Sequence, residues 1–205
     1  MAETLGVEQR WSAARPRVLV VACSDGRLQE ATDEFLERRL GVAHYDRLYV
    51  PGGGGALSAS GREFMRAHAL REECRFLVEA HGVERIVLLF HGPAADGPAE
   101  SMCADYRRKH AWATIAQLRA QQERDARDLL ETRWQWAGAA QVLVYRCEVL
   151  ASNALSFVTL HADAPRLADA ASRPDDRGDG AGAARARPAP LHALRRLGER
   201  RNESR

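Results

Sequence analysis

Two unbroken runs of apolar residues limit most strongly what this chain can fold into. Residues 18–22 and 86–90 read Val-Leu-Val-Val-Ala and Ile-Val-Leu-Leu-Phe, without the polar alternation of a strand that has one wet face. Such strands are covered on both faces, as in the parallel sheets of α/β proteins. We therefore predict strands over residues 17–22 and 84–90 that neighbour each other inside a mostly parallel sheet.

Helical periodicity fills the intervals between the predicted strands. Apolar residues recur at helical spacing over 29–40 and 62–80, and Gly41 and Gly82 follow as stop signals. A longer polar helix is expected over 100–136, with a break near 110–112, and short strands over 48–50, 142–145 and 155–160. This alternation predicts a single α/β domain with a mostly parallel central β-sheet flanked by helices, and with the last strand antiparallel at an edge.

The composition fits one cytoplasmic domain. A chain of 205 residues with 45% hydrophobic content is long enough for one core. Its net charge of +2 lacks the basic excess that nucleic-acid binding requires. No segment approaches the roughly 20 apolar residues of a membrane span, so we expect neither a membrane nor a nucleic acid as partner.

The composition also divides the chain into three parts. We predict an N-terminal extension over 1–16, a folded domain over 17–162, and a tail over 163–205 that is rich in Ala, Arg and Pro. The tail has almost no large apolar side chains before Leu191 and cannot bury enough surface to offset the entropy of ordering it. We therefore expect the tail to be disordered, apart from a short basic helix over 191–201.

Side chains suited to metal binding stand where the buried strands end. Cys23 directly follows one strand, His91 follows the other, and Cys103 comes after a stretch rich in Gly and Pro. The carboxyl ends of neighbouring parallel strands share one edge of the sheet, so these residues can converge. Two Cys and one His fill three of the four tetrahedral positions of Zn²⁺ and leave one for a reactive water. The other cysteines, Cys74 and Cys147, are assigned to the core.

Asp25 and Arg27 provide a second signal in the segment that follows the first strand. In an extended chain, alternation would put Cys23, Asp25 and Arg27 on one side. An Asp beside an Arg stays ionised and oriented, which suits an acceptor for a metal-bound water. The alternative is that residues 25–26 form a turn and that Arg27 caps a nearby group.

Four glycines at 52–55 follow the second predicted strand. They lack both the Lys of a P-loop and the G-x-G-x-x-G spacing, so a phosphate cradle is the weaker interpretation. We expect instead a tight loop that lets the backbone approach the metal pocket.

Together these motifs resemble the β-class carbonic anhydrases. That family has Cys-x-Asp-Ser/Ala-Arg and His-x-x-Cys, and this chain has Cys-Ser-Asp-Gly-Arg at 23–27, followed by His91 and Cys103. The likeness covers residues 17–160 and implies a β-carbonic anhydrase-like fold. It also implies site residues, with Zn²⁺ held by Cys23, His91 and Cys103 and a catalytic dyad of Asp25 and Arg27.

The chain departs from that family in two places. Eleven residues separate His91 from Cys103, where the family has two. The glycines at 52–55 stand in place of the family's Arg-Asn-x-Gly-Asn segment, so side chains that line the usual pocket are absent. Metal binding is therefore better supported by the sequence than any one substrate.

The resemblance implies a zinc lyase that reversibly hydrates carbon dioxide to bicarbonate through a zinc-bound hydroxide, and it implies a homodimer. Zinc lowers the pKa of its bound water to about 7, a value for which carbonic anhydrase is itself the reference case. Two alternatives stay open. One is hydrolysis of carbonyl sulfide or carbon disulfide at the same site, and the other is a non-catalytic zinc protein in which Asp25 or a residue of 92–102 closes the fourth position. A thiol-redox protein is disfavoured because the chain lacks Cys-x-x-Cys spacing.

Overall fold

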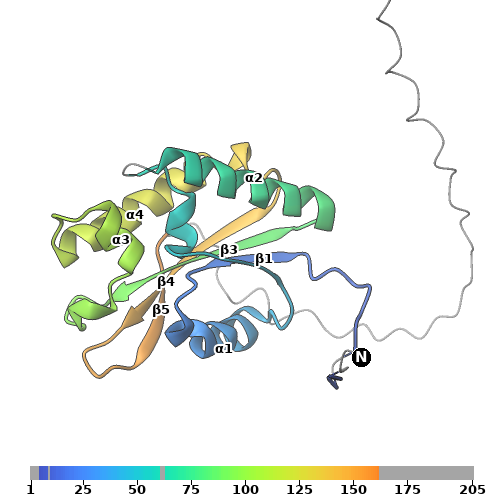
Figure 1. Ribbon diagram of the computed structural model, residues 1–205, viewed down its shortest axis with the longest axis horizontal. Helices are drawn as coiled ribbons and strands as arrows, with labels where there is room; N and C mark the ends of the chain where they lie inside the picture. The colour runs from blue at the N-terminus through green and yellow to red at the C-terminus, as the bar shows by residue number, and fades with distance from the viewer. Residues whose placement is uncertain (1–4, 9, 61–62, 162–205) are drawn as a thin grey trace, which may run out of the picture. The chain divides into compact units, whose positions relative to one another are not determined.

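Strands and helices alternate along the chain in the computed structural model, which describes residues 5–8, 10–60 and 63–161 (Figure 1). In chain order they are β1 (Val18–Ala22), α1 (Gln29–Leu40), β2 (Asp46–Tyr49), α2 (Phe64–His81), β3 (Arg85–Pro93), α3 (Ala104–Lys109), α4 (Ile115–Glu131), β4 (Gln141–Val149) and β5 (Leu155–Thr159). The sheet order is β2-β1-β3-β4-β5, with β5 antiparallel to β4 and the other pairs parallel. The predicted fold class is confirmed, whereas the predicted tail over 163–205 lies outside the described residues.

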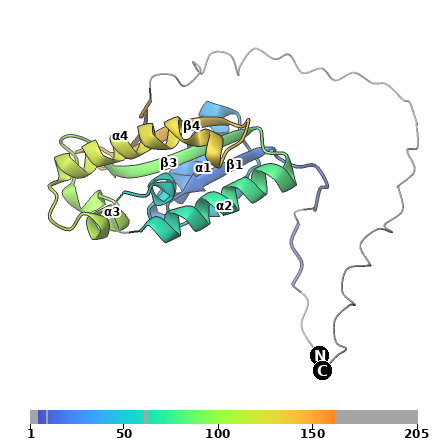
Figure 2. The same cartoon turned by 90° about the horizontal axis from the view of Figure 1, so that it is seen from above.

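Helices cover both faces of the sheet, and each face has its own apolar core (Figures 1 and 2). On one face, Phe35 and Leu36 of α1 pack with Val20 of β1. On the other face, residues of α2 and α4 pack with Leu88 of β3. Successive side chains of a strand point to opposite faces, which is why the unbroken apolar runs of β1 and β3 serve both cores.

Local signals explain most of the element boundaries. Gly41 adopts a left-handed conformation (φ 65°), and its N–H bonds the Leu36 carbonyl to end α1. Thr114 and Gln117 form a reciprocal capping box that starts α4. This box divides the predicted helix over 100–136 into α3 and α4, as the expected break near 110–112 indicated. In contrast, β3 continues beyond the predicted residue 90, because β4 pairs with it as far as Pro93.

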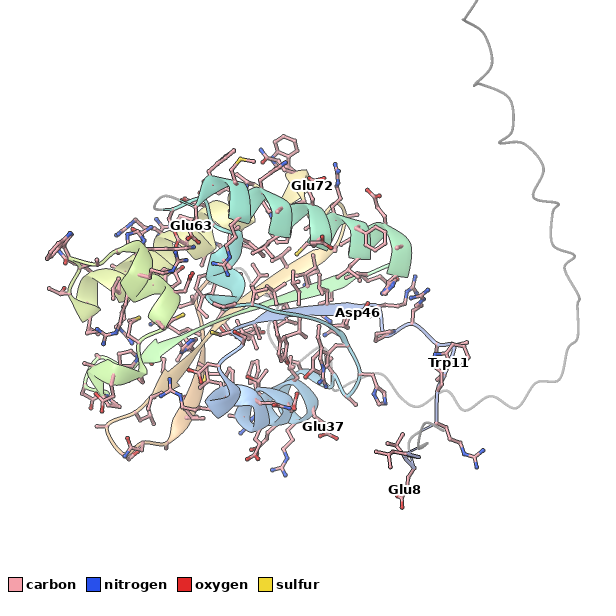
Figure 3. The ribbon with its side chains drawn as sticks, in the orientation of Figure 1. Glu8, Trp11, Glu37, Asp46, Glu63 and Glu72 are labelled. Carbon is pink, nitrogen blue, oxygen red and sulfur yellow. The ribbon has the colours of Figure 1, made fainter. Side chains whose placement is uncertain are left out.

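The helices expose charged residues on their outer faces, and α2 also exposes Phe64, Met65 and Phe76. Glu37 on α1 and Glu72 on α2 point away from the sheet on its two sides (Figure 3). No helix in the described part of the chain is long and apolar enough to cross a membrane.

The packing of α1 can be tested with Leu36→Ala. Leu36 is fully buried, so its truncation should lower the free energy of unfolding by about 2–5 kcal/mol through lost burial and the cavity left behind. The neighbouring Glu37→Ala, on the exposed face, is the matched control and should change it by less than about 0.5 kcal/mol. Urea denaturation measures both values, and equal midpoints for the two variants would contradict the assignment of α1 to the core.

Candidate metal centre

β1 and β3 deliver two of the predicted ligands to one edge of the sheet. The strands are adjacent and parallel, with Val21 opposite Leu88, so their carboxyl ends lie together. Cys23 follows the end of β1, and His91 lies near the end of β3. Cys103 directly precedes α3, to which the chain returns after the loop that follows β3.

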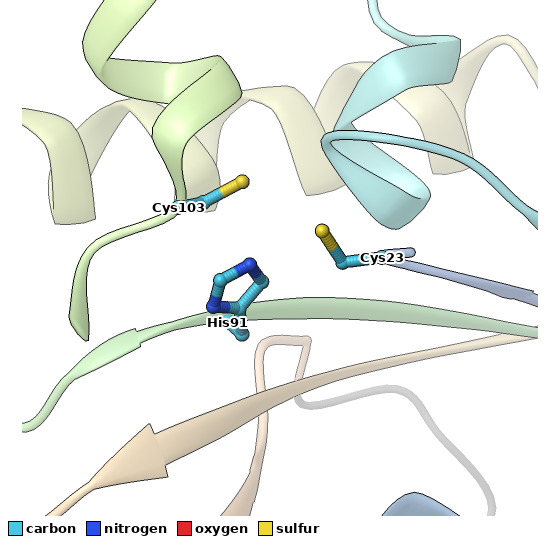
Figure 4. A group of neighbouring side chains, drawn as sticks. All are labelled: Cys23, His91 and Cys103. Atoms are coloured by element: carbon cyan, nitrogen blue, oxygen red, sulfur yellow. The ribbon is translucent and has the colours of Figure 1, made fainter. Parts of the chain in front are cut away.

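The structure brings all three side chains together. The sulfur atoms of Cys23 and Cys103 and a ring nitrogen of His91 lie within 4.8 Å of one another, and Figure 4 shows them turned toward the same space. Tetrahedral zinc holds two sulfur ligands roughly 3.8 Å apart, so a small inward movement would suffice. His91 and Cys103 are buried, whereas Cys23 is partly exposed, so solvent reaches the group beside Cys23.

The two sulfur atoms differ in their affinity for a proton. The adjacent Cys103 thiol and, after it, the His91 imidazole hold the pKa of Cys23 well below its ordinary value, although burial opposes this. The same pairing with Cys23, together with burial, raises the pKa of Cys103. These pKa directions favour the thiolate form at Cys23 and the protonated form at Cys103. A divalent cation that displaced this proton would meet two thiolates.

The His91 ring presents a free nitrogen to the sulfur atoms. Its Nε2, the ring nitrogen farther from the backbone, faces them (Figure 4) and is buried without a hydrogen-bond partner among the described residues. The backbone of His91 is held from α4, because the fully buried Gln122 donates a hydrogen bond from Nε2 to the His91 carbonyl oxygen at 2.9 Å. Buried polar atoms without a partner are rare, and this one is suited to coordinate a cation.

Asp25 and Arg27 form a closed pair next to the cysteine. Arg27 donates from Nε to Oδ1 at 2.9 Å and from Nη2 to Oδ2 at 2.6 Å, and it lowers the pKa of Asp25 to about 2. The expectation that alternation brings the two together is wrong, because Gly26–Leu28 is a 3₁₀ turn capped by the Asp25 side chain. The alternative interpretation was a turn at this place, and this turn is what brings the Arg27 side chain to Asp25.

A comparison of the sequence with models of protein families shows where this chain belongs. The model of a family described as "Putative carbonic anhydrase" matches residues 14–129, more than half of the chain. The chain belongs to this carbonic anhydrase family. The family resemblance predicted from the sequence motifs is confirmed, and all five predicted site residues lie within the matched range.

Two solved structures are similar to this carbonic anhydrase family member. The β-carbonic anhydrase CafA of Aspergillus fumigatus is 16% identical, with 77% of this chain and 82% of that chain covered and a TM-score of 0.38. The β-carbonic anhydrase isoform TvaCA1 of Trichomonas vaginalis is 12% identical, with 75% and 88% covered and a TM-score of 0.35. No curated protein sequence matches the chain. The family assignment therefore rests on residues 14–129.

The four glycines at 52–55 let a loop of this family member pass close to the ligand-bearing segments. Gly52 has a φ of 97°, and a Cβ there would collide with the Asp105 carboxylate. A Cβ on Gly55 would collide with the Tyr106 ring. Any side chain would therefore push the loop away from α3, which begins directly after Cys103.

Residues that brace the ligand-bearing segments were missed by the sequence reasoning. Tyr106 donates a hydrogen bond to the Asp125 carboxylate at 2.7 Å, and Ser60 donates to the same carboxylate at 2.8 Å. Tyr106 and Asp125 are fully buried, as is Gln122 behind His91. No motif marks these residues, since each acts on a partner that is distant in sequence. The one available signal was the position of residues 105 and 106 directly after Cys103.

The close approach of the loop can be tested with Gly52→Ala. Gly82→Ala is the matched control, because Gly82 also has a positive φ (63°) but has open space around its Cα. The control should lose about 1–2 kcal/mol of unfolding free energy from backbone strain alone, and Gly52→Ala should lose a further ~1–3 kcal/mol from the collision with Asp105. Equal losses in urea denaturation would show that Gly52 is needed only for its backbone conformation.

Proposed function

We propose that this chain is a zinc-dependent carbonic anhydrase that interconverts carbon dioxide and bicarbonate. The family supports this class of reaction, and one observation carries the assignment. Three soft donors meet at the carboxyl edge of the sheet, and a carboxylate held by Arg27 lies two residues after Cys23. We propose Cys23, His91 and Cys103 as the zinc ligands and Asp25 with Arg27 as the catalytic pair. The homodimer implied by the resemblance stays a prediction.

The donor set fits zinc. Sulfur and imidazole nitrogen are typical zinc ligands, and two thiolates would balance the charge of the cation. Coordination would also give the buried His91 Nε2 the partner that the described residues do not provide. Bound zinc would supply a water acidic enough to attack carbon dioxide at neutral pH.

The position of Asp25 favours a catalytic site over a closed structural one. Both carboxylate oxygens accept hydrogen bonds from Arg27, and no Asp25 oxygen belongs to the described group of converging donor atoms. A carboxylate held in this way is not free to occupy a fourth metal position. This supports an open position and speaks against the non-catalytic alternative in which Asp25 closes it.

Asp25 and Arg27 have different proposed roles. With its pKa lowered to about 2, Asp25 is ionised at neutral pH and can accept a hydrogen bond but not donate one. An acceptor at this place would orient the attacking water toward carbon dioxide. The Arg27 side chain is 73% exposed, so it fixes Asp25 on one side and offers a cation to the anionic product on the other.

Loss of any proposed ligand should remove zinc and activity together. Cys23→Ser, His91→Ala and Cys103→Ser should each weaken zinc binding by more than about 100-fold, beyond the usual effect of residues that only support ligands. Cys74→Ala is the control, because Cys74 is buried in α2 outside the donor group. Elemental analysis of the purified protein and stopped-flow carbon dioxide hydration measure the two effects, with carbonyl sulfide and carbon disulfide assayed alongside. Full zinc content in Cys103→Ser would remove that residue from the ligand set.

Asp25→Ala should separate metal binding from catalysis. We expect normal zinc content and a hydration rate about 10²–10⁴-fold lower, as is typical when a group that orients a proton is removed. Asp128→Asn, on the exposed face of α4, is the control and should keep both properties. A zinc-loaded Asp25→Ala protein with an unchanged rate would contradict the proposed role.

A further inference from the structure

An ionic cluster around the buried Asp105 carboxylate connects α3, which begins directly after Cys103, to Arg66 of α2. The Asp105 side chain is 2% exposed and pairs with Arg66 at 3.1 Å, Arg108 at 2.7 Å and Lys109 at 3.5 Å. Lys109 is the one lysine of the chain, and its side chain is 1% exposed. Burying the charges of Asp105 and Lys109 is costly even though they are paired, so this cluster calls for a reason other than stability.

The cluster is joined through α3 to Cys103, one of the two proposed sulfur ligands. Asp105 lies two residues after Cys103, which caps the start of this helix. The backbone N–H groups of Tyr106 and Asp105 also act on the Cys103 sulfur and favour its thiolate. Any shift of Asp105 would therefore move the donor atom of Cys103.

Cys23, the other proposed sulfur ligand, is held by the loop that follows β2. The Val50 N–H donates to the Ala22 carbonyl at 3.0 Å, and the Val50 carbonyl accepts from the Ser24 N–H at 3.2 Å. The loop is therefore hydrogen-bonded to the backbone on both sides of Cys23. A Cβ on Gly53 would come within 2.8 Å of the Cys23 nitrogen, which shows how closely the loop approaches this residue.

The ionic cluster contacts the same loop at three points. Arg66, while paired with Asp105, donates from Nη2 to the Pro51 carbonyl at 2.6 Å. The Asp105 carboxylate packs against Gly52. Lys109 donates from Nζ to the Gly55 carbonyl at 3.2 Å. Asp105 thus pairs with both cations that donate to the loop, Arg66 of α2 and Lys109 of α3, and Glu63 also pairs with Arg66.

We propose that Asp105 is a positioning residue for the two sulfur ligands, since it fixes the loop that holds Cys23 against the helix that begins after Cys103. This inference rests on the proposed zinc function. Groups that hold metal ligands from behind usually change metal affinity when they are altered. Here the group acts on two ligands from different segments at once.

Asp105→Asn tests the proposal, because it keeps the size of the side chain and removes the charge that gathers the three cations. Glu72→Gln is the matched control, since Glu72 on α2 (Figure 3) also pairs with an arginine, Arg75, but lies outside the described contacts of the cluster. Zinc affinity is measured by competition with a chromophoric chelator, and the visible spectrum of the Co²⁺-loaded protein reports ligand geometry. We expect Asp105→Asn to bind zinc about 10–100-fold more weakly and to shift the Co²⁺ bands, and Glu72→Gln to do neither.

A second variant covers the case in which Asp105→Asn does not fold. Arg66→Gln releases Pro51 while Asp105 keeps its pairs with Arg108 and Lys109, and it should also weaken zinc binding. In the metal-free protein, residues 50–57 should exchange their amide hydrogens faster than in the wild type. Wild-type zinc affinity and exchange in both variants would overturn the inference and leave the proposed function intact. A wild-type protein that binds zinc but does not hydrate carbon dioxide would refute the proposed function and leave this inference intact.

Discussion

The parallel pairing of β1 with β3 is the constraint on which the candidate site depends. The register that sets Val21 opposite Leu88 puts the residues after β1 level with the last residues of β3. Cys23 and His91 thereby reach the same edge of the sheet, where the loop after β2 also hydrogen-bonds to the residues on both sides of Cys23. The apolar runs bury these same strands on both faces, so the packing of the core and the meeting of the donors depend on the same pair of strands.

The third donor depends on a different kind of contact. Cys103 arrives from a long loop after β3, and the helix α3 that follows it packs against the glycine loop at 52–55 and is braced by the hydrogen bond from Tyr106 to Asp125. Four residues without side chains allow backbone to lie where a Cβ would strike Asp105 or Tyr106. The glycine segment that departs from the usual family pattern is therefore compatible with a metal centre here, with the contact between helix and backbone taking the place of pocket side chains.

The sequence predicted those parts of the fold and site that depend on local patterns. The apolar runs, the helical spacing of 29–40 and the rule for parallel crossovers were enough to expect Cys23 and His91 at one edge. Contacts between distant segments were not predictable, which is why the end of β3 and the bracing by Gln122 and Asp125 were missed. Arg27 was misplaced for a local reason, because the hydrogen bonds of Asp25 turn the chain where alternation assumed an extended strand.

Unsatisfied polar atoms gather at this site, and this links its stability to its chemistry. Five buried side-chain atoms lack a hydrogen-bond partner in the described residues, and three of them belong to His91, Asp105 and Gln122, at or directly behind the donors. Natural chains follow the rules of polar satisfaction closely and break them mainly at functional sites. A cation would coordinate His91 Nε2 and displace the remaining thiol proton of Cys23 and Cys103. Metal binding would therefore offset the free-energy cost of burying a polar atom without a partner. Folding and metal binding should therefore be coupled, with the ionic cluster around Asp105 holding the donors near their bound positions before the cation arrives.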